Sequence, residues 1–206
     1  MSLGLETGQG LYAIVLAAGA ASRFGSAKQL VRIAGRPLLH NTVSRAVDVT
    51  GAATIVVLGA YATELAPLLR HTPATVVVNR SWREGIGSSI RIGVGHLPAT
   101  CDGVMIVLAD QAAVTAEDLR RLVSAWKRQP EYSAAALYSG GTGVPAIFPR
   151  SRFSELADLR GDIGARKLLQ RNPDRLVRVP MESAALDIDT PEDLLSLDAG
   201  QQNTPS

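Results

Sequence analysis

Residues 12 to 30 read YAIVLAAGAASRFGSAKQL, and this stretch decides the fold. Its first part is an uninterrupted apolar run, which is typical of a strand buried on both faces. The run leads into a loop of small residues that carries one arginine, Arg23, and one lysine, Lys28. Small residues let a ligand approach the backbone N–H groups, and the two cations add positive charge at the same point. The loop therefore predicts a polyphosphate site.

The spacing of this loop differs from two common phosphate-binding patterns. Its glycines and lysine follow Gly19-x5-Gly25-x2-Lys28. A P-loop needs Gly-x4-Gly-Lys followed by serine or threonine, and a dinucleotide fingerprint would need glycine at Ala21 and Phe24. Both patterns fail on residue identity. The alternative without function is a glycine-rich turn between a strand and a helix, with two solvated cations.

Apolar runs alternate with segments of helical periodicity along the rest of the chain. Strands are expected at 11–17, 54–58, 75–78, 103–109, 134–138, 146–148 and 176–179, and helices at 38–47, 63–70, 88–96, 115–128, near 153, at 164–170 and at 191–197. This alternation predicts an α/β fold with a mostly parallel sheet, in which ligands bind at the carboxyl ends of the strands. One domain is expected over residues 1–198, followed by a disordered tail at 199–206.

The composition excludes several classes of protein. The formal net charge is +2 over 206 residues, and the basic residues are spread along the chain, which argues against a nucleic-acid surface. The single cysteine, Cys101, excludes an internal disulfide, and three histidines suggest no zinc cluster. No apolar run reaches the roughly 18 to 20 residues of a membrane span, and the amino terminus lacks the positive charge of a signal peptide. We therefore expect a cytoplasmic protein without nucleic-acid or membrane partners.

Carboxylates stand at two points where a cation can be held. Asp110 ends the apolar run at 104–109, on the sheet edge where the Gly19 loop is expected. Asp187 and Asp189 alternate in an extended segment before a helix start, so they point to the same side. Magnesium prefers one or two carboxylates together with phosphate oxygens, which makes all three residues candidate Mg²⁺ ligands. The alternatives are loop capping by Asp110 and a solvated pair at the other two positions.

The segment NRSWREGIGSSIRIG at 79–93 opens an expected helix. Gly85 with Ser88 and Ser89 supplies backbone and hydroxyl donors at the positive end of that helix, which suits a base edge or a ribose. In the alternative, the serines only cap the helix, and Trp82 is an anchor in the core.

The segment GDIGAR at 161–166 opens another expected helix. Donors at Gly164 and Ala165, or an acidic contact from Asp162, would suit a second, acceptor substrate. Capping of the helix by Asp162 is the simpler explanation of this segment.

Together these motifs resemble those of the MobA-like nucleotidyltransferases, in particular their molybdenum cofactor cytidylyltransferase (MocA-like) branch. The resemblance extends from about residue 13 to residue 195 and is carried by LAAG at 16–19, SRFG at 22–25, KQL at 28–30, Asn79-x2-Trp82-x2-Gly85-x2-Ser88-Ser89, LADQ at 108–111, GDIGAR at 161–166 and DIDTPED at 187–193. It implies a Rossmann-like three-layer sandwich of the nucleotide-diphospho-sugar transferase type. It also implies Mg²⁺-dependent transfer of a nucleoside monophosphate to a phosphorylated acceptor, with release of pyrophosphate.

The resemblance further implies roles for individual residues. Residues expected to contact the nucleotide are Leu16, Ala17, Ala18, Gly19, Arg23, Lys28, Gly85, Ser88 and Ser89. The expected catalytic residues are Arg23, Lys28 and Asp110, and the expected metal ligands are Asp110 with Asp187 or Asp189. Residues expected to contact the acceptor are Gln111, Asp162, Gly164 and Ala165.

Two departures from the family pattern bear on the substrates. Ala18 precedes Gly19, where the guanylyl-transferring branch usually has a second glycine, and this favours CTP over GTP. Ala112 stands where many relatives have a proline. That proline would stiffen the loop that contacts the acceptor. We expect the acceptor to be molybdopterin. A molybdoenzyme is a further expected partner. The alternatives are a guanylyltransferase using GTP, an NAD(P)H-dependent oxidoreductase on a similar body, and a non-catalytic nucleotide-binding maturation factor for a molybdoenzyme.

Overall fold

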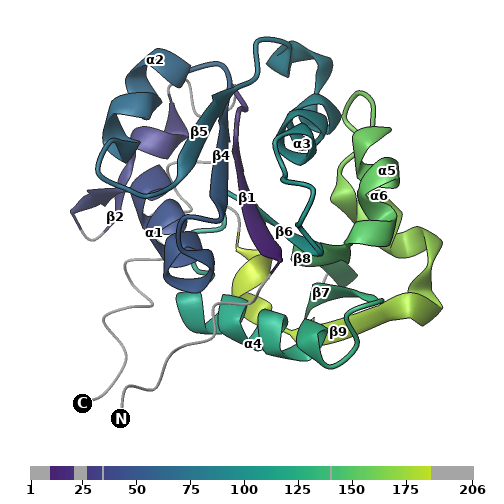
Figure 1. The fold of residues 1–206 in the computed structure, drawn as a ribbon. Coiled ribbons are helices and arrows are strands. Elements are labelled where there is room, and N and C mark those ends of the chain that lie inside the picture. The colour runs from purple at the N-terminus through teal and green to yellow at the C-terminus, as the bar shows by residue number, and fades with distance from the viewer. Residues whose placement is uncertain (1–9, 21–26, 34, 140, 187–206) are drawn as a thin grey trace, which may run out of the picture.

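The computed structural model describes residues 10–20, 27–33, 35–139 and 141–186, and it is built around one seven-stranded sheet (Figure 1). The strands of this sheet are β1 (Leu11–Ala17), β4 (Thr54–Leu58), β5 (Thr75–Val78), β6 (Gly103–Leu108), β7 (Ser133–Tyr138), β8 (Gly141–Pro149) and β9 (Leu176–Pro180). Strands β2 (Arg32–Ile33) and β3 (Arg36–Pro37) form a separate antiparallel pair.

The order of the large sheet is β5-β4-β1-β6-β8-β7-β9. Neighbours are parallel except around β8, which runs antiparallel to both β6 and β7. The expected α/β fold with a mostly parallel sheet is therefore confirmed. Because β1 and β6 are adjacent and parallel, the loops that follow them leave the sheet at the same edge.

Helices cover both faces of the sheet. The α-helices are α1 (Leu38–Thr50), α2 (Ala62–Leu65), α3 (Ile86–Gly95), α4 (Ala116–Lys127), α5 (Phe153–Ala157) and α6 (Ala165–Arg171). The 3₁₀ helices are η1 (Lys28–Leu30), η2 (Ala66–Leu69), η3 (Trp82–Glu84), η4 (Arg150–Arg152), η5 (Pro173–Arg175) and η6 (Glu182–Ala185). Figure 1 shows α3, α5 and α6 on one side of the sheet, and α1, α2 and α4 on the other. Among the described residues, no helix is both long and apolar enough to cross a membrane.

Strand β1 divides its side chains between two cores. Ala13 and Val15 belong to the core beneath α1, α2 and α4, while Ile14 and Leu16 belong to the core beneath α3, α5 and α6. All four side chains are buried, as alternation along a strand with two covered faces requires. The sheet is therefore the middle of three layers.

Local chemistry explains where the elements differ from the sequence-based expectations. The helix expected at 63–70 is split into α2 and η2, because Pro67 has no N–H group with which to continue an α-helix. Helix α6 begins after Gly164 without a side-chain cap, so the expected capping by Asp162 is wrong. Helix α3 likewise begins after Gly85 without a side-chain cap. The helix expected at 191–197 and the tail at 199–206 lie outside the described residues.

Candidate functional site

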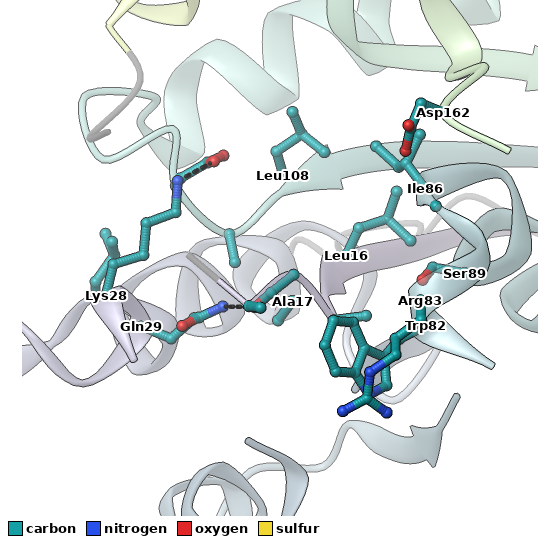
Figure 2. Close-up of a pocket in the computed structure, with 17 residues that line it drawn as sticks. Leu16, Ala17, Lys28, Gln29, Trp82, Arg83, Ile86, Ser89, Leu108 and Asp162 are labelled. Carbon is teal, nitrogen blue, oxygen red and sulfur yellow. Dashed lines mark hydrogen bonds and ion pairs between the residues drawn. The ribbon is translucent and has the colours of Figure 1, made fainter. Parts of the chain in front are cut away.

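A cavity of about 410 Å³ opens at the carboxyl ends of β1 and β6 (Figure 2). Seven of the residues expected to contact a nucleotide line it, namely Leu16, Ala17, Ala18, Gly19, Lys28, Gly85 and Ser89. Figure 2 shows Lys28 and Gln29 on one side of the cavity, with Trp82, Arg83 and Ser89 on the other. The fold thus brings the small-residue loop, the end of β6 and the start of α3 around one space.

Lys28 and Asp110 meet directly at the edge of this cavity. The ammonium nitrogen Nζ of Lys28 lies 2.7 Å from Oδ2 of Asp110, across 82 positions of sequence. The two side chains are only 12% and 23% exposed, so water screens the pair weakly. The second carboxylate oxygen, Oδ1, is buried and accepts no hydrogen bond from the described residues. The expectation that Asp110 lies on the same sheet edge as the loop after β1 is confirmed.

Hydrogen bonds orient the loop that follows β1. The carbonyl oxygen of Ala18 accepts from the Ala60 N–H (3.1 Å), that of Gly19 from Gln29 Nε2 (3.1 Å), and that of Ala20 from the Tyr61 hydroxyl (3.1 Å). In a trans peptide the N–H points opposite to the C=O of the same unit. The N–H groups of Gly19 and Ala20, which follow the carbonyls of Ala18 and Gly19, therefore point away from the donors that hold those carbonyls. Such a loop can offer several N–H groups to one anion.

Gly19 leaves space for a ligand on the cavity side of the loop. The residue is exposed, and a β-carbon built on it would meet no atom of the described residues within 4 Å. Gly59 behaves in the opposite way, since a β-carbon there would lie 2.4 Å from the carbonyl oxygen of Ala18. Gly59 is thus needed for packing beneath the loop, whereas Gly19 leaves room above it.

The start of α3 faces the cavity through Gly85, Ser89 and Trp82. Trp82 is half-buried and lines the cavity, with the Arg83 guanidinium carbon 4.4 Å from the centre of its ring. Its interpretation as an anchor in the core is therefore wrong, because the residue is only half-buried and lines the cavity. Ser89 is 3% exposed, and its hydroxyl accepts a hydrogen bond from Asn79 Nδ2 at 3.0 Å.

Ser88 lies elsewhere than expected. It is 1% exposed and does not line the cavity. Its hydroxyl is 2.8 Å from the carbonyl oxygen of Gly85 and 3.1 Å from that of Ser81, and it accepts from Asn79 Nδ2 at 2.8 Å. These bonds occupy the hydroxyl within the protein, so the structure gives Ser88 the role of fixing the turn before α3 instead of contacting a ligand.

A second cavity, of about 200 Å³, adjoins the first. Both are lined by Leu16, Ile86 and Leu108, which form a shared aliphatic wall. The other walls of the second cavity come from α3, β6, the β7–β8 hairpin and the start of α6. Its remaining lining residues are Ile90, Ile106, Gln111, Tyr138, Gly143, Val144, Gly164, Ala165 and Arg166.

Three of the four residues expected to contact an acceptor, namely Gln111, Gly164 and Ala165, line this second cavity. The fourth, Asp162, lines the first cavity instead, because the loop before α6 packs against the start of α3. The Gly87 N–H donates to the carbonyl oxygen of Gly161 at 3.0 Å and makes that contact.

Gln111 ties the end of the described chain to the loop after β6. Its Nε2 donates to the carbonyl oxygens of Val144 (2.8 Å) and Ala184 (3.1 Å), and the residue is 2% exposed. Helix η6, which contains Ala184, therefore lies beside the residue that follows Asp110. Nearby, the hydroxyl of Ser183 donates to Asp118 at the start of α4.

Several expected site residues lie outside the described part of the chain, namely Arg23, Asp187 and Asp189. Within the described residues, no group of three or more His, Cys, Asp or Glu side chains could hold a metal ion by itself. Asp110 nevertheless fits the usual manner of Mg²⁺ binding, in which one or two carboxylates act together with substrate phosphates.

Sequence reasoning missed several residues that line the first cavity, above all Gln29, Trp82 as a cavity residue, Arg83, Ile86 and Leu108. Gln29 follows Lys28 directly in the KQL motif, and Leu108 stands two residues before Asp110. Their proximity in sequence to Lys28 and Asp110 could therefore have predicted both of them as residues of the cavity. No pattern in the sequence signals Ile86 as part of a wall shared by two cavities.

Comparisons with known proteins identify the family of the chain. Residues 13–176 match the model of the MobA-like NTP transferase domain. The chain is 28% identical over 197 residues to nicotine blue oxidoreductase of Paenarthrobacter nicotinovorans, covering 89% of this chain and 94% of the relative. The crystal structure of Rv0371c from Mycobacterium tuberculosis H37Rv superimposes with a TM-score of 0.78 at 27% identity, covering 92% of this chain and 97% of that one.

Two further solved structures extend the comparison. A crystal structure of Rv0371c in complex with manganese matches with a TM-score of 0.75 at 27% identity, covering 92% of this chain and 97% of that one. Molybdopterin-guanine dinucleotide biosynthesis protein A from Archaeoglobus fulgidus shares the fold, with a TM-score of 0.66 at 18% identity over 94% of this chain and all of that one (100%). The family match covers most of the chain and the motifs that line the first cavity, and on this evidence the chain belongs to the MobA-like NTP transferase domain family.

Proposed function

We propose that the protein transfers CMP from CTP to the terminal phosphate of a molybdopterin-type acceptor and releases pyrophosphate. The observation that carries this proposal is the meeting of Lys28 and Asp110 at the mouth of a ligand-sized cavity, beside a loop with room above Gly19. Membership of a family of NTP transferases supports the reaction class. The preference for CTP rests on Ala18 in the first motif.

The two sides of the first cavity suit the two ends of a nucleotide. The triphosphate would lie along Gly19 and Ala20, where backbone N–H groups and Lys28 supply positive charge. The base would lie toward Trp82, which offers a flat ring, and toward Ser89, which offers a hydroxyl. Arg23 would add a second cation for the phosphates.

Mg²⁺ is the proposed cofactor. Asp110 would hold it, with Asp187 or Asp189 as the second ligand, since Gln111 fixes the chain at Ala184 close to the loop after β6. The cation would supply neutralisation of the negative charge on the phosphate oxygens. The manganese complex of Rv0371c supports use of a divalent cation in a related structure.

The protein's own residues would act by positioning and by charge. A phosphate of the acceptor is already an anion at neutral pH, so no general base is required. Its oxygen forms a bond to the α-phosphorus of CTP, the bond from that phosphorus to the bridging oxygen breaks, and pyrophosphate leaves with the electron pair. Lys28 and the loop N–H groups would stabilise the charge that develops on the transferring and leaving groups.

The second cavity would hold the acceptor. Its aliphatic walls, built by Ile90, Ile106 and Val144, suit the apolar faces of a ring system. Tyr138 and Arg166 add hydrogen-bonding groups to the same cavity. A molybdoenzyme would receive the product. We place the reaction in the cytoplasm, where the thiol of Cys101, whose pKa burial raises to about 11, would remain reduced and unreactive.

The reaction is tested with a panel of nucleotides. Purified protein is incubated with Mg²⁺, a molybdopterin acceptor, and CTP, GTP, ATP or UTP in turn, and pyrophosphate release is measured. We expect release with CTP to be at least about tenfold faster than with GTP. Faster release with GTP would instead make the protein a guanylyltransferase. Binding of CTP without release in any mixture would indicate a maturation factor without catalytic activity.

A second candidate function is an NAD(P)H-dependent oxidoreductase. It is favoured by the 28% identity to nicotine blue oxidoreductase, which extends over most of both chains. The absence of a dinucleotide glycine pattern in the loop after β1 argues against it. Loss of nicotinamide absorbance, with a heteroaromatic dye as electron acceptor and no nucleoside triphosphate present, would establish this activity.

Replacing Gly19 with alanine is expected to weaken CTP binding without changing stability. The new methyl group would meet no atom within 4 Å in the part of the chain that the structure describes, so it would stand in the space assigned to the phosphates. We expect a Kd for CTP about tenfold higher, equivalent to about 1.4 kcal/mol, measured by isothermal titration. Gly95→Ala is the matched control, since it also has nothing within 4 Å but lies at the far end of α3. Equal affinity for CTP in both variants would show that the phosphates do not bind at this loop.

A further inference from the structure

Lys28 engages the oxygen of Asp110 that a divalent cation would need. Nζ of Lys28 lies 2.7 Å from Oδ2, while Oδ1 is buried and accepts no hydrogen bond from the described residues. Asp110 lines the first cavity, and its side chain is 23% exposed. A cation that approaches this carboxylate from the cavity therefore meets the oxygen that Lys28 already engages.

The ammonium of Lys28 and a divalent cation cannot share this oxygen. Positive charges a few ångströms apart repel strongly where little water separates them, and both side chains here are mostly buried. Withdrawal of Lys28 with no replacement would leave the carboxylate as an uncompensated charge. The two cations are therefore alternatives at Oδ2, and a phosphate group that attracts Lys28 would favour the exchange.

The loop after β1 is placed to hold that anion. Lys28 is the first residue of η1, and the neighbouring Gln29 donates a hydrogen bond to the carbonyl oxygen of Gly19 at 3.1 Å. This bond fixes η1 to the loop, whereas the lysine side chain is a flexible stem that carries a compact charge. A triphosphate lying along Gly19 and Ala20 would thus come within reach of Lys28 with no movement of the backbone.

We propose that Lys28 is an internal substitute for the divalent cation. It neutralises Asp110 until a nucleoside triphosphate binds, then moves to the phosphates and leaves Oδ2 to the metal. This inference rests on the nucleotidyl-transfer function proposed above and adds an order to it. The free protein takes up the metal poorly, and the nucleotide and the metal promote each other's binding.

The test measures Mn²⁺ binding by electron paramagnetic resonance in the absence of nucleotide. Lys28→Met keeps the length of the stem and removes the charge, so we expect it to bind Mn²⁺ about tenfold more tightly than the wild type. Lys28→Arg keeps the charge and should resemble the wild type. Lys127→Met, at an exposed lysine of α4, is the control for general loss of charge. Equal or weaker Mn²⁺ binding by Lys28→Met would overturn the proposal.

A second measurement needs no substitution at Lys28. The chain contains only three lysines, Lys28, Lys127 and Lys167, so reductive ¹³C-methylation, which keeps their charge, gives a simple NMR spectrum. A non-hydrolysable CTP analogue without metal should shift the Lys28 signal and leave the other two unchanged. In the free protein, Asp110→Asn should shift the same signal. A Lys28 signal that does not respond to the analogue would contradict the exchange.

These outcomes are separate from those that test the transfer reaction, because neither readout depends on an acceptor or on pyrophosphate. Tighter Mn²⁺ binding by Lys28→Met, with no pyrophosphate release by the wild type, would uphold the exchange and reject the reaction. Unchanged Mn²⁺ binding by Lys28→Met, with normal pyrophosphate release by the wild type, would reject the exchange and uphold the reaction.

Discussion

Replacing Asp110 with asparagine is expected to lower the rate of pyrophosphate release by about 100- to 1,000-fold, the usual cost of removing one electrostatic contact to a transition state. Asparagine keeps the size of the side chain but cannot neutralise Lys28 or hold Mg²⁺ as a carboxylate does. The ammonium of Lys28, 2.7 Å from Oδ2 in the native protein, would lose its ion pair with this carboxylate. The measurement is a single-turnover assay at saturating CTP, with unfolding in urea as a check on stability.

Asp102→Asn provides the matched control, because Asp102 immediately precedes β6 whereas Asp110 follows it. Asp102 is exposed and lies at the amino end of the strand, away from the cavity. We expect its replacement to leave turnover unchanged. A folded Asp110→Asn variant that retained the wild-type rate would show that the chemistry does not occur at this edge of the sheet.

Replacing Gly85 with alanine is expected to lower the free energy of unfolding by at least about 2 kcal/mol. Gly85 has φ 103° and ψ 179°, a backbone conformation that is essentially restricted to glycine. A β-carbon there would lie 2.4 Å from the carbonyl carbon of Gly161 and 2.5 Å from Oδ1 of Asp162. The loop before α6 would have to move, and the first cavity, which Gly85 and Asp162 both line, would change shape. Urea denaturation measures the first effect, and CTP titration measures the second.

Gly95→Ala serves as the comparison for this substitution as well. Gly95 is the last residue of α3, and a β-carbon there would meet nothing within 4 Å. Alanine is favoured over glycine in helices, so stability should stay the same or rise slightly. If Gly85→Ala and Gly95→Ala had equal unfolding free energies, the constraint at the start of α3 would be refuted.

The sequence predicts the elements of the sheet well because most strands are continuous apolar runs. The limits expected at 11–17, 54–58 and 75–78 agree with the structure at both ends. Strand β8 is longer than expected, because the glycines at its start resemble a turn. A β-carbon at Gly143 would clash with the hydroxyl group of Tyr138 on β7, so only glycine leaves room for that side chain. Such a contact depends on the partner strand, which local sequence does not specify.

The candidate site was predictable to the extent that it depends on strand ends. Leu16 to Gly19 and Asp110 gather because β1 and β6 are adjacent and parallel, as the α/β pattern implies. Direct contact between Lys28 and Asp110 was not predictable, since it depends on how η1 packs. The positions of Ser88 and Asp162 depend likewise on a hydrogen bond and a steric fit between α3 and the loop before α6, which meet only in the folded chain.

The strand order has a consequence for how such proteins diversify. Nearly all residues around the first cavity precede position 111, whereas most of those that belong only to the second cavity come from position 111 onward. Under the proposed function, mutations in the carboxyl-terminal half would change which second reactant is accepted while the amino-terminal half kept the handling of the first. A fold divided in this way would let descendants acquire new specificities by altering one segment of the gene.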